Sequence, residues 1–350
     1  MKKVSVIIPC YNAVKFIDRC MNSLLSQTIG TDQLELIVIN DGSSDDTYTE
    51  LCRWEQRYPE QMLVINCEQN GRQGTARNIG LDYASGQYIA YMDVDDYIEP
   101  DMYEKMYDKA LEYDCDMVVI RSKAYQEYKF GTISLGRTGK ENSFLEIRSK
   151  DDREYLLDMN IGDGPCNKLI RASVLKDNDI RFPEKLYYED LCFTELLKHY
   201  VNSLYIIEEY LYHHIIQSNS AAFHTANPDR YLDYLDSFTV EEVLLTELKE
   251  RGIYQEFQVR YERDFILNGY VALLRFYLRT GQQFPYDSFS YIRRRTLELY
   301  PEYKKNPYIS MILAGKAGRT LQILCESLEQ ELTPKSVLEL GMAVLSSAGS

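Results

Sequence analysis

The sequence contains no apolar run long enough to cross a membrane. Its first apolar run, from Val4 to Ile8, stops at Pro9, whereas a membrane helix needs about 20 apolar residues. The run is also too short for the core of a signal peptide. The eight cysteines form no CxxC pair, and no cysteine–histidine group has zinc-site spacing. These absences predict a cytoplasmic protein with reduced thiols and no transmembrane helix.

The sequence also lacks an excess of positive charge. Its formal net charge is −15, which argues against broad nucleic-acid binding because that activity needs a basic surface. An acidic protein that binds an anionic ligand needs a metal ion or a local basic cluster to do so. Hydrophobic content of 45% over 350 residues is ordinary for a globular protein, and the length suits one large and one small domain.

Three common phosphate-binding or catalytic motifs are missing. No GxGxxG follows the first apolar run, which weakens a dinucleotide-binding interpretation. No GxxxxGK[ST] occurs, which excludes a P-loop enzyme, and no GxSxG marks a nucleophile elbow.

The first third of the chain alternates short apolar runs with helical patterns. Strands are expected at 4–8, 34–39, 62–66 and 88–92, with helices at 16–26, 47–58 and 75–84. This alternation predicts a parallel sheet with right-handed crossovers. Ligands bind at the carboxyl ends of the strands in such sheets, and the loops rich in Asp, Asn, Gly and Ser all follow those ends.

The fourth apolar run ends in an acidic cluster, Asp93, Asp95 and Asp96. If the chain stays extended there, Asp93 and Asp95 project from the same face. Two such carboxylates repel unless a cation lies beside them, and their oxygens suit Mg²⁺ or Mn²⁺. The alternative is a solvated turn in which Asp96 caps the following helix.

Together these loops resemble the family 2 glycosyltransferases, which are inverting enzymes with the GT-A fold. The matching segments are 4–12, 37–47, 74–80, 92–96 and 189–190. The resemblance is strong over residues 1–125, good at 160–220 and absent beyond about 230. It implies an α/β GT-A fold, a Rossmann-like and mostly parallel sheet flanked by helices, with a helical C-terminal module. The second half looks like members that decorate capsule, O-antigen or teichoic acid.

The resemblance implies a site for a UDP-sugar donor formed by Pro9, Tyr11, Asp41, Arg77 and Asp93. Pro9 and Tyr11 would pack on the base, and Asp41 would accept the uracil N3 proton. Arg77 would be a cation beside the base and the acidic cluster, and Asp93 would approach the ribose or the metal. Three alternatives remain: Tyr11 covering the sheet, Asp41 closing an Asx-turn in Asn-Asp-Gly, and Arg77 as a surface helix residue.

The resemblance further implies a Mn²⁺ or Mg²⁺ ion held by Asp95 and Asp93. Some relatives use a histidine near the diphosphate or the ion, and His214 is the preferred candidate for a third ligand here. The alternative is that His213 and His214 are ordinary polar residues on a strand or loop.

In the acceptor half, the resemblance implies that Asp190 is the general base, placed at the start of a helix. Two alternatives stay open: Glu189 is the base, or both acids only favour the positive end of that helix. The family's tryptophan before the acceptor-half lysine is missing, since Pro165–Asn167 stands there. The QxxRW element of processive synthases is also missing, which points to the addition of single sugars.

The expected domains are a catalytic domain at 1–225 and a helical module at 226–350. The module carries basic residues, among them Arg293–Arg295, Lys304, Lys305 and Arg319. They are compatible with contact to an anionic membrane bearing a lipid-linked acceptor, or with a solvated helical face. Apolar helical patterns at 321–332 and 337–345 would pack on the catalytic domain or join two copies in a homo-oligomer.

The expected function is transfer of one sugar from a UDP-sugar to a hydroxyl of a cell-surface or lipid-linked glycan. The alternatives are a nucleotidyltransferase and a sugar-nucleotide-binding protein without catalysis.

Overall fold

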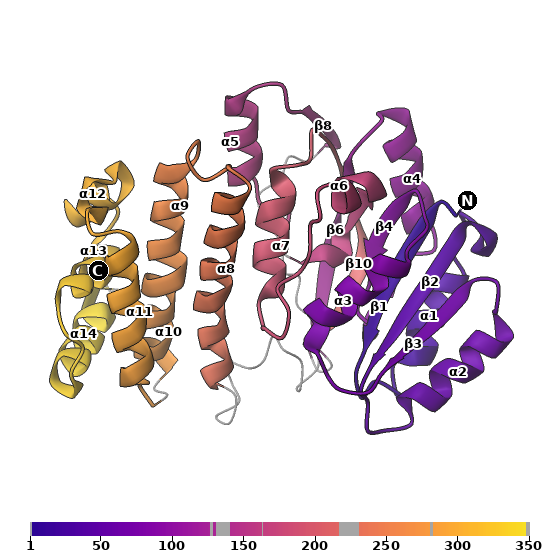
Figure 1. Cartoon of the computed structure of the whole chain (residues 1–350), viewed down its shortest axis with the longest axis horizontal. Coiled ribbons are helices and arrows are strands. Elements are labelled where there is room, and N and C mark those ends of the chain that lie inside the picture. Colours follow the sequence, from indigo (N-terminus) through magenta and orange to yellow (C-terminus); the bar gives the residue numbers. More distant parts are fainter. Residues whose placement is uncertain are drawn as a thin grey trace. The chain divides into compact units, whose positions relative to one another are not determined.

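The computed structural model describes residues 2–126, 129–130, 141–162, 164–216, 231–280 and 283–347. The chain divides into two compact units, Met1–Ser218 and Asn219–Ser350 (Figure 1). The domain boundary expected at 225/226 lies outside the described residues, and the two domain assignments stay predictions.

Four parallel strands form one half of the sheet in the first unit, in the order β3-β2-β1-β4. They are β1 (Val4–Cys10), β2 (Leu34–Asp41), β3 (Met62–Cys67) and β4 (Tyr88–Tyr91). Every residue of β1 and β4 is buried, as expected for apolar strands covered on both faces. The four strands predicted from apolar runs are therefore confirmed.

The other half of the sheet reverses direction. Strand β9 (Lys168–Arg171) runs antiparallel to β4 and to β6 (Met117–Gln126). Strand β10 (Ser203–Ile216) is parallel to β6 and antiparallel to β5 (Tyr97–Ile98). Two short strands complete the sheet, β7 (Lys129–Phe130) and β8 (Ser143–Glu146). Among the described residues the result is a mixed, ten-stranded sheet, which confirms the expected α/β class but is less parallel than expected, since only β1 to β4 and the β6–β10 pair run parallel.

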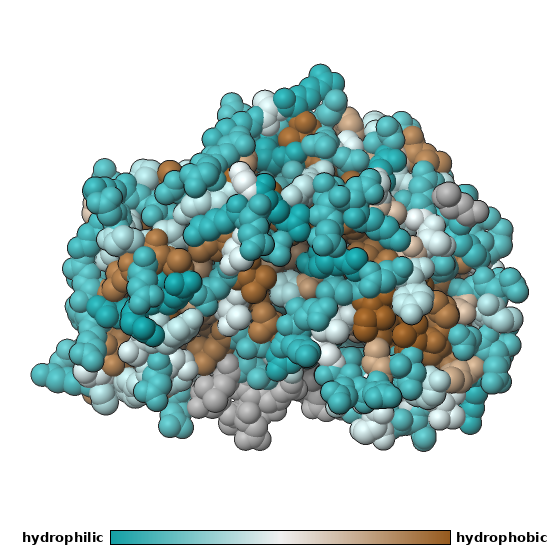
Figure 2. Space-filling model, viewed as in Figure 1, coloured by the Kyte–Doolittle hydropathy of each residue, from teal (hydrophilic) through white to brown (hydrophobic). Residues whose placement is uncertain are grey.

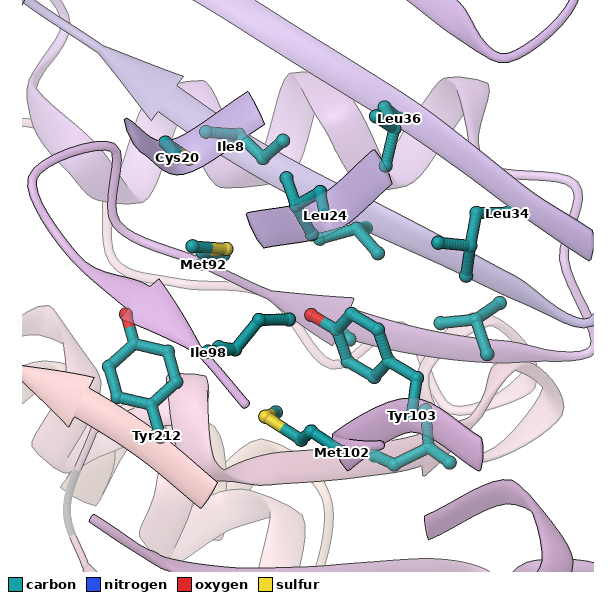
Figure 3. Packing of buried hydrophobic residues seen from close by; sticks show 14 of the residues in the cluster. Ile8, Cys20, Leu24, Leu34, Leu36, Met92, Ile98, Met102, Tyr103 and Tyr212 are labelled. Atoms are coloured by element: carbon teal, nitrogen blue, oxygen red, sulfur yellow. The ribbon is translucent and has the colours of Figure 1, made fainter. Parts of the chain in front are cut away.

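Helices flank this sheet (Figure 1). They are α1 (Ile17–Leu25), α2 (Thr47–Arg57), α3 (Arg72–Tyr83), α4 (Met102–Glu112), α5 (Lys150–Asp158), α6 (Ala172–Asp177) and α7 (Glu189–Lys198). Figure 3 shows Leu24 of α1 and Tyr103 of α4 among the strand residue Ile8 and the loop residue Met92. Met92 is fully buried, so the segment that leads into the acidic cluster is fixed in the core.

Helix α3 packs tightly on the sheet because Gly80 has no side chain. A Cβ at this position would collide with Cγ2 of Ile7 and lie 2.9 Å from Cδ1 of Ile39. The close approach fixes the last turns of α3 against β1 and β2.

We expect Gly80→Ala to lower the free energy of unfolding by about 1–3 kcal/mol, because the added methyl group overpacks the contact with the sheet. The matched control is Gly341→Ala, also in a helix, where the nearest atom would be Leu278 Cδ2 at 3.9 Å. There the alanine should be neutral or stabilise the helix by up to about 1 kcal/mol. Urea unfolding of both variants tests the difference, and equal stability of the two variants would contradict the packing argument.

The second unit is helical over its described residues, as expected. Its longer helices are α8 (Asp236–Glu250), α9 (Gln258–Asp264), α10 (Leu273–Thr280), α11 (Tyr286–Leu299), α12 (Pro307–Leu313), α13 (Arg319–Glu326) and α14 (Pro334–Ser347). A π-helical segment, Phe265–Ala272, joins α9 to α10, and 3₁₀ turns lie at Tyr231–Leu235, Tyr303–Lys305 and Ser327–Glu329. None of the described helices is long and apolar enough to span a bilayer.

Apolar side chains also reach the surface, which is mostly hydrophilic with scattered apolar patches on the face drawn in Figure 2. In α14, Leu338, Met342 and Leu345 are each more than half exposed. Their spacing of four and three residues puts them on one face of the helix.

Candidate active site

The acidic cluster lies in a tight turn rather than in an extended strand. Strand β4 ends at Tyr91, and the backbone N–H of Asp96 donates to the carbonyl oxygen of Asp93 at 3.1 Å. The prediction that Asp93 and Asp95 share one face of an extended strand is therefore wrong, because this hydrogen bond reverses the chain. The carboxylates nevertheless remain clustered, since the charges of Asp96 and Asp93 both raise the pKa of Asp95.

Asp96 is fully buried and holds the turn against β10. Its carboxylate accepts hydrogen bonds from Tyr212 Oη at 2.5 Å and from the backbone N–H of Ile215 at 2.7 Å, and lies 3.1 Å from His214 Nδ1. Burial raises its pKa, and the bond to His214 opposes the rise. The alternative that Asp96 caps the next helix is wrong, since α4 begins after Asp101.

Asp95 carries the clearest sign of crowded negative charge. Burial, together with the charges of Asp96 and Asp93, raises the pKa of Asp95 to about 7. A divalent cation beside Asp93 and Asp95 would offset this repulsion, and carboxylate oxygens are the ligands that Mg²⁺ and Mn²⁺ prefer. The donor set therefore fits the expected ion, although the described part of the chain contains no preformed group of three or more ligating side chains.

His214 lies in β10 beside this turn. Burial lowers its pKa, but the hydrogen bond and charge of Asp96 outweigh that effect and raise the pKa to about 9. A protonated imidazole donates hydrogen bonds and cannot ligate a metal, so metal binding here requires loss of that proton. The neighbouring His213 points elsewhere: its Nε2 lies 2.7 Å from Glu99 Oε1, and its ring stacks on Tyr97.

Arg77 joins the acidic turn to the start of α7. It is 2% exposed, and its guanidinium donates to Asp93 Oδ1 at 2.9 Å and to Glu189 Oε1 at 2.6 Å. Its carbon Cζ also lies 5.2 Å from the centre of the Phe182 ring. Because the side chain is buried and doubly paired, the alternative of a surface helix arginine is wrong.

Glu189 and Asp190 form the first turn of α7 but have different surroundings. Glu189 is 5% exposed, and burial raises its pKa to about 7 against the opposing charge of Arg77. Asp190 is half-buried, and its Oδ2 would lie 3.9 Å from a Cβ at Gly164. Asp190 therefore faces the loop between α5 and β9, whereas Glu189 faces inward to Arg77.

That loop is fixed by a lysine that the sequence analysis did not select as a site residue. Lys168 is fully buried, and its Nζ donates to the carbonyls of Gly162 at 2.6 Å and Gly164 at 2.7 Å. Asn167 adds a bond to the carbonyl of Ile161 at 3.0 Å. A lysine directly before an apolar strand, after a Gly- and Pro-containing loop, was the available signal.

The residues expected to hold the base lie at the ends of β1 and β2, which pair side by side. Pro9 is buried in β1, whereas Tyr11 is 52% exposed just beyond it. Burial, aided by the charges of Asp95 and Asp93, raises the pKa of Cys10, so this end of β1 lies near the acidic turn.

Asp41, at the end of β2, connects this region to the start of α3. Its Oδ1 accepts from the backbone N–H of Gly71 at 2.8 Å, and its carbonyl oxygen accepts from Asn70 Nδ2 at 3.2 Å. Burial raises its pKa, and the hydrogen bonds oppose the rise. Asp41 thus braces a loop thirty residues away, and the alternative of a local Asx-turn is wrong.

The chain is similar to known proteins both in sequence and in structure. Residues 5–178 match the family described as glycosyl transferase family 2. The uncharacterized glycosyltransferase YibD of Escherichia coli is 30% identical over 275 residues, covering 74% of this chain and 77% of that protein. The poly(ribitol-phosphate) beta-glucosyltransferase of Bacillus spizizenii is 28% identical over 61% of this chain, which spans only 32% of that longer protein.

Among solved structures, Staphylococcus aureus TarS (residues 1–349, in complex with UDP) has a TM-score of 0.62 at 21% identity, covering 99% of this chain and 91% of that one. This likeness shows a shared fold. Together with the family match and the YibD relationship, it leads to one conclusion: the chain belongs to glycosyltransferase family 2.

Proposed function

We propose that this protein transfers a single sugar from a UDP-sugar to a hydroxyl group of a cell-surface or lipid-linked glycan, with inversion at the anomeric carbon. The observation that carries the proposal is the shared guanidinium of Arg77, which ties the acidic turn to the helix bearing Asp190. Relatives of the chain include enzymes named as poly(ribitol-phosphate) glycosyltransferases, which supports the substrate class. Structures of TarS with UDP and with UDP-GlcNAc support the donor class.

The donor's uridine would occupy the ends of β1 and β2. The exposed face of Tyr11 offers a stacking surface for the base, beside Pro9. The carboxylate of Asp41, whose position is already fixed by Gly71, would accept a hydrogen bond from the N3–H group of uracil. A carboxylate held in this way distinguishes a base that presents an N–H donor from one that does not.

The diphosphate would lie at the acidic turn, where Asp93 and Asp95 would hold Mn²⁺ or Mg²⁺. When bound, such an ion supplies Lewis-acid stabilisation of the negative charge that develops on the departing diphosphate. We keep His214 as a candidate third ligand, through its Nε2 in the neutral form. Arg77 would fix the orientation of Asp93 by its hydrogen bond to Oδ1.

Asp190 would act as the general base. Its carboxylate would take the proton of the acceptor hydroxyl as that oxygen attacks the anomeric carbon from the side opposite the diphosphate. Glu189 is less suited to this step because it is buried and paired with Arg77. We therefore assign Glu189 the role of holding the first turn of α7 in place.

We also propose a cytoplasmic site of action, with residues 1–225 catalytic and residues 226–350 making peripheral contact with the membrane or with a second copy of the chain. The apolar face of α14 supports contact with a partner surface. The basic residues expected to serve that role are largely paired: Arg295 contacts Glu242 at 2.7 Å, and Lys304 contacts Glu329.

The proposed reaction is tested by measuring UDP release from a panel of UDP-sugars with Mn²⁺, with Mg²⁺ and with a chelator. We expect metal-dependent release, and a loss of at least roughly a hundredfold in Asp95→Asn, because ion stabilisation of the leaving group is worth several kcal/mol. UDP binding by this variant should no longer depend on metal. The control is Asp108→Asn, an exposed carboxylate of α4, which should behave as the unchanged protein.

Two results would count against this proposal. If UDP is released equally fast in the presence of the chelator, the reaction does not depend on a metal ion. Tight binding of a UDP-sugar with no release under any condition would favour the sugar-nucleotide-binding protein instead.

A further inference from the structure

The second unit contains a cavity of about 990 Å³, formed by the π-helical segment, α10, α13 and the last turn of α14. All of its lining residues lie between Leu267 and Ser347, so the cavity belongs to this unit alone. Its volume is at the upper end of the range typical for small-molecule pockets. None of the residues proposed for sugar transfer contributes to it.

Three arginines gather at this cavity. Arg275 and Arg279 lie one turn apart on α10, and Arg319 is the first residue of α13. All three are exposed, and no carboxylate within the described ranges forms an ion pair with any of them. Several other arginines of the unit are paired, as Arg251 is with Glu247 at 2.8 Å and Arg295 with Glu242 at 2.7 Å.

Unpaired positive charge is costly to gather in one place. Like charges four residues apart on a helix repel, and Arg319 adds a third cation from another helix. The positive end of α13 lies at the same position, since Arg319 opens that helix. Because the net charge of the whole chain is −15, three arginines at one cavity, unpaired within the described residues, indicate a local binding site for an anion. A phosphate group suits them, since a guanidinium can donate two parallel hydrogen bonds to two phosphate oxygens.

The rest of the lining is largely apolar. Leu267, Val271 and Phe276 contribute from one side, and Leu321 and Leu324 from α13. Inorganic phosphate or a polyhydroxylated phosphate polymer would leave this apolar surface in contact with water. A phosphate that carries a hydrocarbon chain would satisfy both parts, with its charge at the arginines and its methylene groups on the apolar side chains.

We propose that this cavity binds the phosphate headgroup of a lipid, together with the first part of its hydrocarbon chain. The inference is independent of the sugar-transfer reaction, because it rests only on residues of the second unit. A lipid site here would hold the protein at a membrane surface without a membrane-spanning helix.

The test uses dihexanoyl phosphatidylglycerol below its micelle concentration, titrated calorimetrically into the full chain. We expect saturable binding that falls by at least about a hundredfold in Arg275→Gln/Arg279→Gln/Arg319→Gln, since each charged hydrogen bond is worth roughly tenfold or more in affinity. The matched control, Arg294→Gln/Lys305→Gln/Lys335→Gln, removes the same charge from exposed positions of the same unit. It should bind within about threefold of the unchanged protein.

Additional titrations distinguish the ligand's source. Inorganic phosphate or a poly(ribitol phosphate) chain that binds as tightly as the lipid would overturn the assignment, as would equal binding of zwitterionic dihexanoyl phosphatidylcholine. Lipid binding unchanged in the triple-arginine variant would also overturn it. UDP binding, measured in the same preparations, should be unaffected, and a helical circular-dichroism signal equal to that of the unchanged protein shows that the second unit is folded. If no UDP is released but the lipid still binds as expected, only the proposed sugar transfer is contradicted, and the proposed lipid site is not.

Discussion

Asp190→Asn is expected to lower the rate of sugar transfer by roughly 10²–10⁴-fold, the usual contribution of a positioned general base. An asparagine fills the same space at the start of α7 but cannot accept the proton of the acceptor hydroxyl. Binding of UDP should change little, because the donor site is formed by other residues. Transfer is measured with a saturating UDP-sugar donor, and UDP binding is measured by calorimetry.

The matched control is Asp151→Asn, which removes an exposed carboxylate from the first turn of another helix, α5. It should leave transfer unchanged and cost only a few tenths of a kcal/mol in stability through the helix dipole. If Asp190→Asn were as active as this control, Asp190 would only stabilise the positive end of α7 and would not be the general base. Loss of activity confined to Glu189→Gln would then make Glu189 the base.

Arg77→Met is expected to reduce the free energy of unfolding by about 3–5 kcal/mol, the cost of leaving buried charge without its partner. Glu189 would lose its ion pair with Arg77 at 2.6 Å, and Asp93 would lose a hydrogen bond at 2.9 Å. Methionine keeps much of the volume of the side chain, so the loss would reflect charge rather than a cavity. Urea unfolding gives the change in stability.

Two further variants separate charge from packing. Arg53→Met removes an exposed arginine that pairs with Glu50 on the same helix, and it should cost less than about 1 kcal/mol. Arg77→Met/Glu189→Gln removes both members of the buried pair and should recover part of the lost stability. A double variant that is less stable than Arg77→Met would contradict the view that Glu189 is left as an uncompensated charge.

The sequence was most informative where one local pattern decides the structure. The strands β1 to β4 are apolar runs closed by turn residues, and their ends carry the loops of the site. Helix α3 begins earlier than its apolar pattern suggests, at Arg72, because Asp41 accepts a hydrogen bond from the N–H of Gly71. That contact joins distant residues and leaves no periodic signal.

The features missed by sequence reasoning all depend on tertiary partners. Asp96 looked like a helix cap, but its hydrogen bonds come from β10, more than a hundred residues later. The same hydrogen bonds hold the acidic turn in place. Because their donors lie far away in the chain, the residues around Asp93 and Asp95 could not show that this segment forms a turn and not an extended strand. Lys168 entered the sequence analysis only as the lysine that follows Pro165–Asn167, without a role, and only the fold shows the carbonyl groups around it.

Hydrogen bonds and an ion pair join helix α3 to the segment before α7 and to the start of that helix. These contacts have a consequence for how binding of one substrate affects the affinity for the other. Asn78 exchanges two hydrogen bonds with the backbone of Phe182, each 2.9 Å long, and Arg77 spans the same gap with its ion pairs. A nucleotide that reorganises Asp93 would therefore act, through the guanidinium of Arg77, on the helix that carries Asp190, the proposed proton acceptor. Such linkage is reciprocal by thermodynamic necessity, so an alcohol seated at Asp190 should tighten the nucleotide by the same factor by which the nucleotide tightens the alcohol.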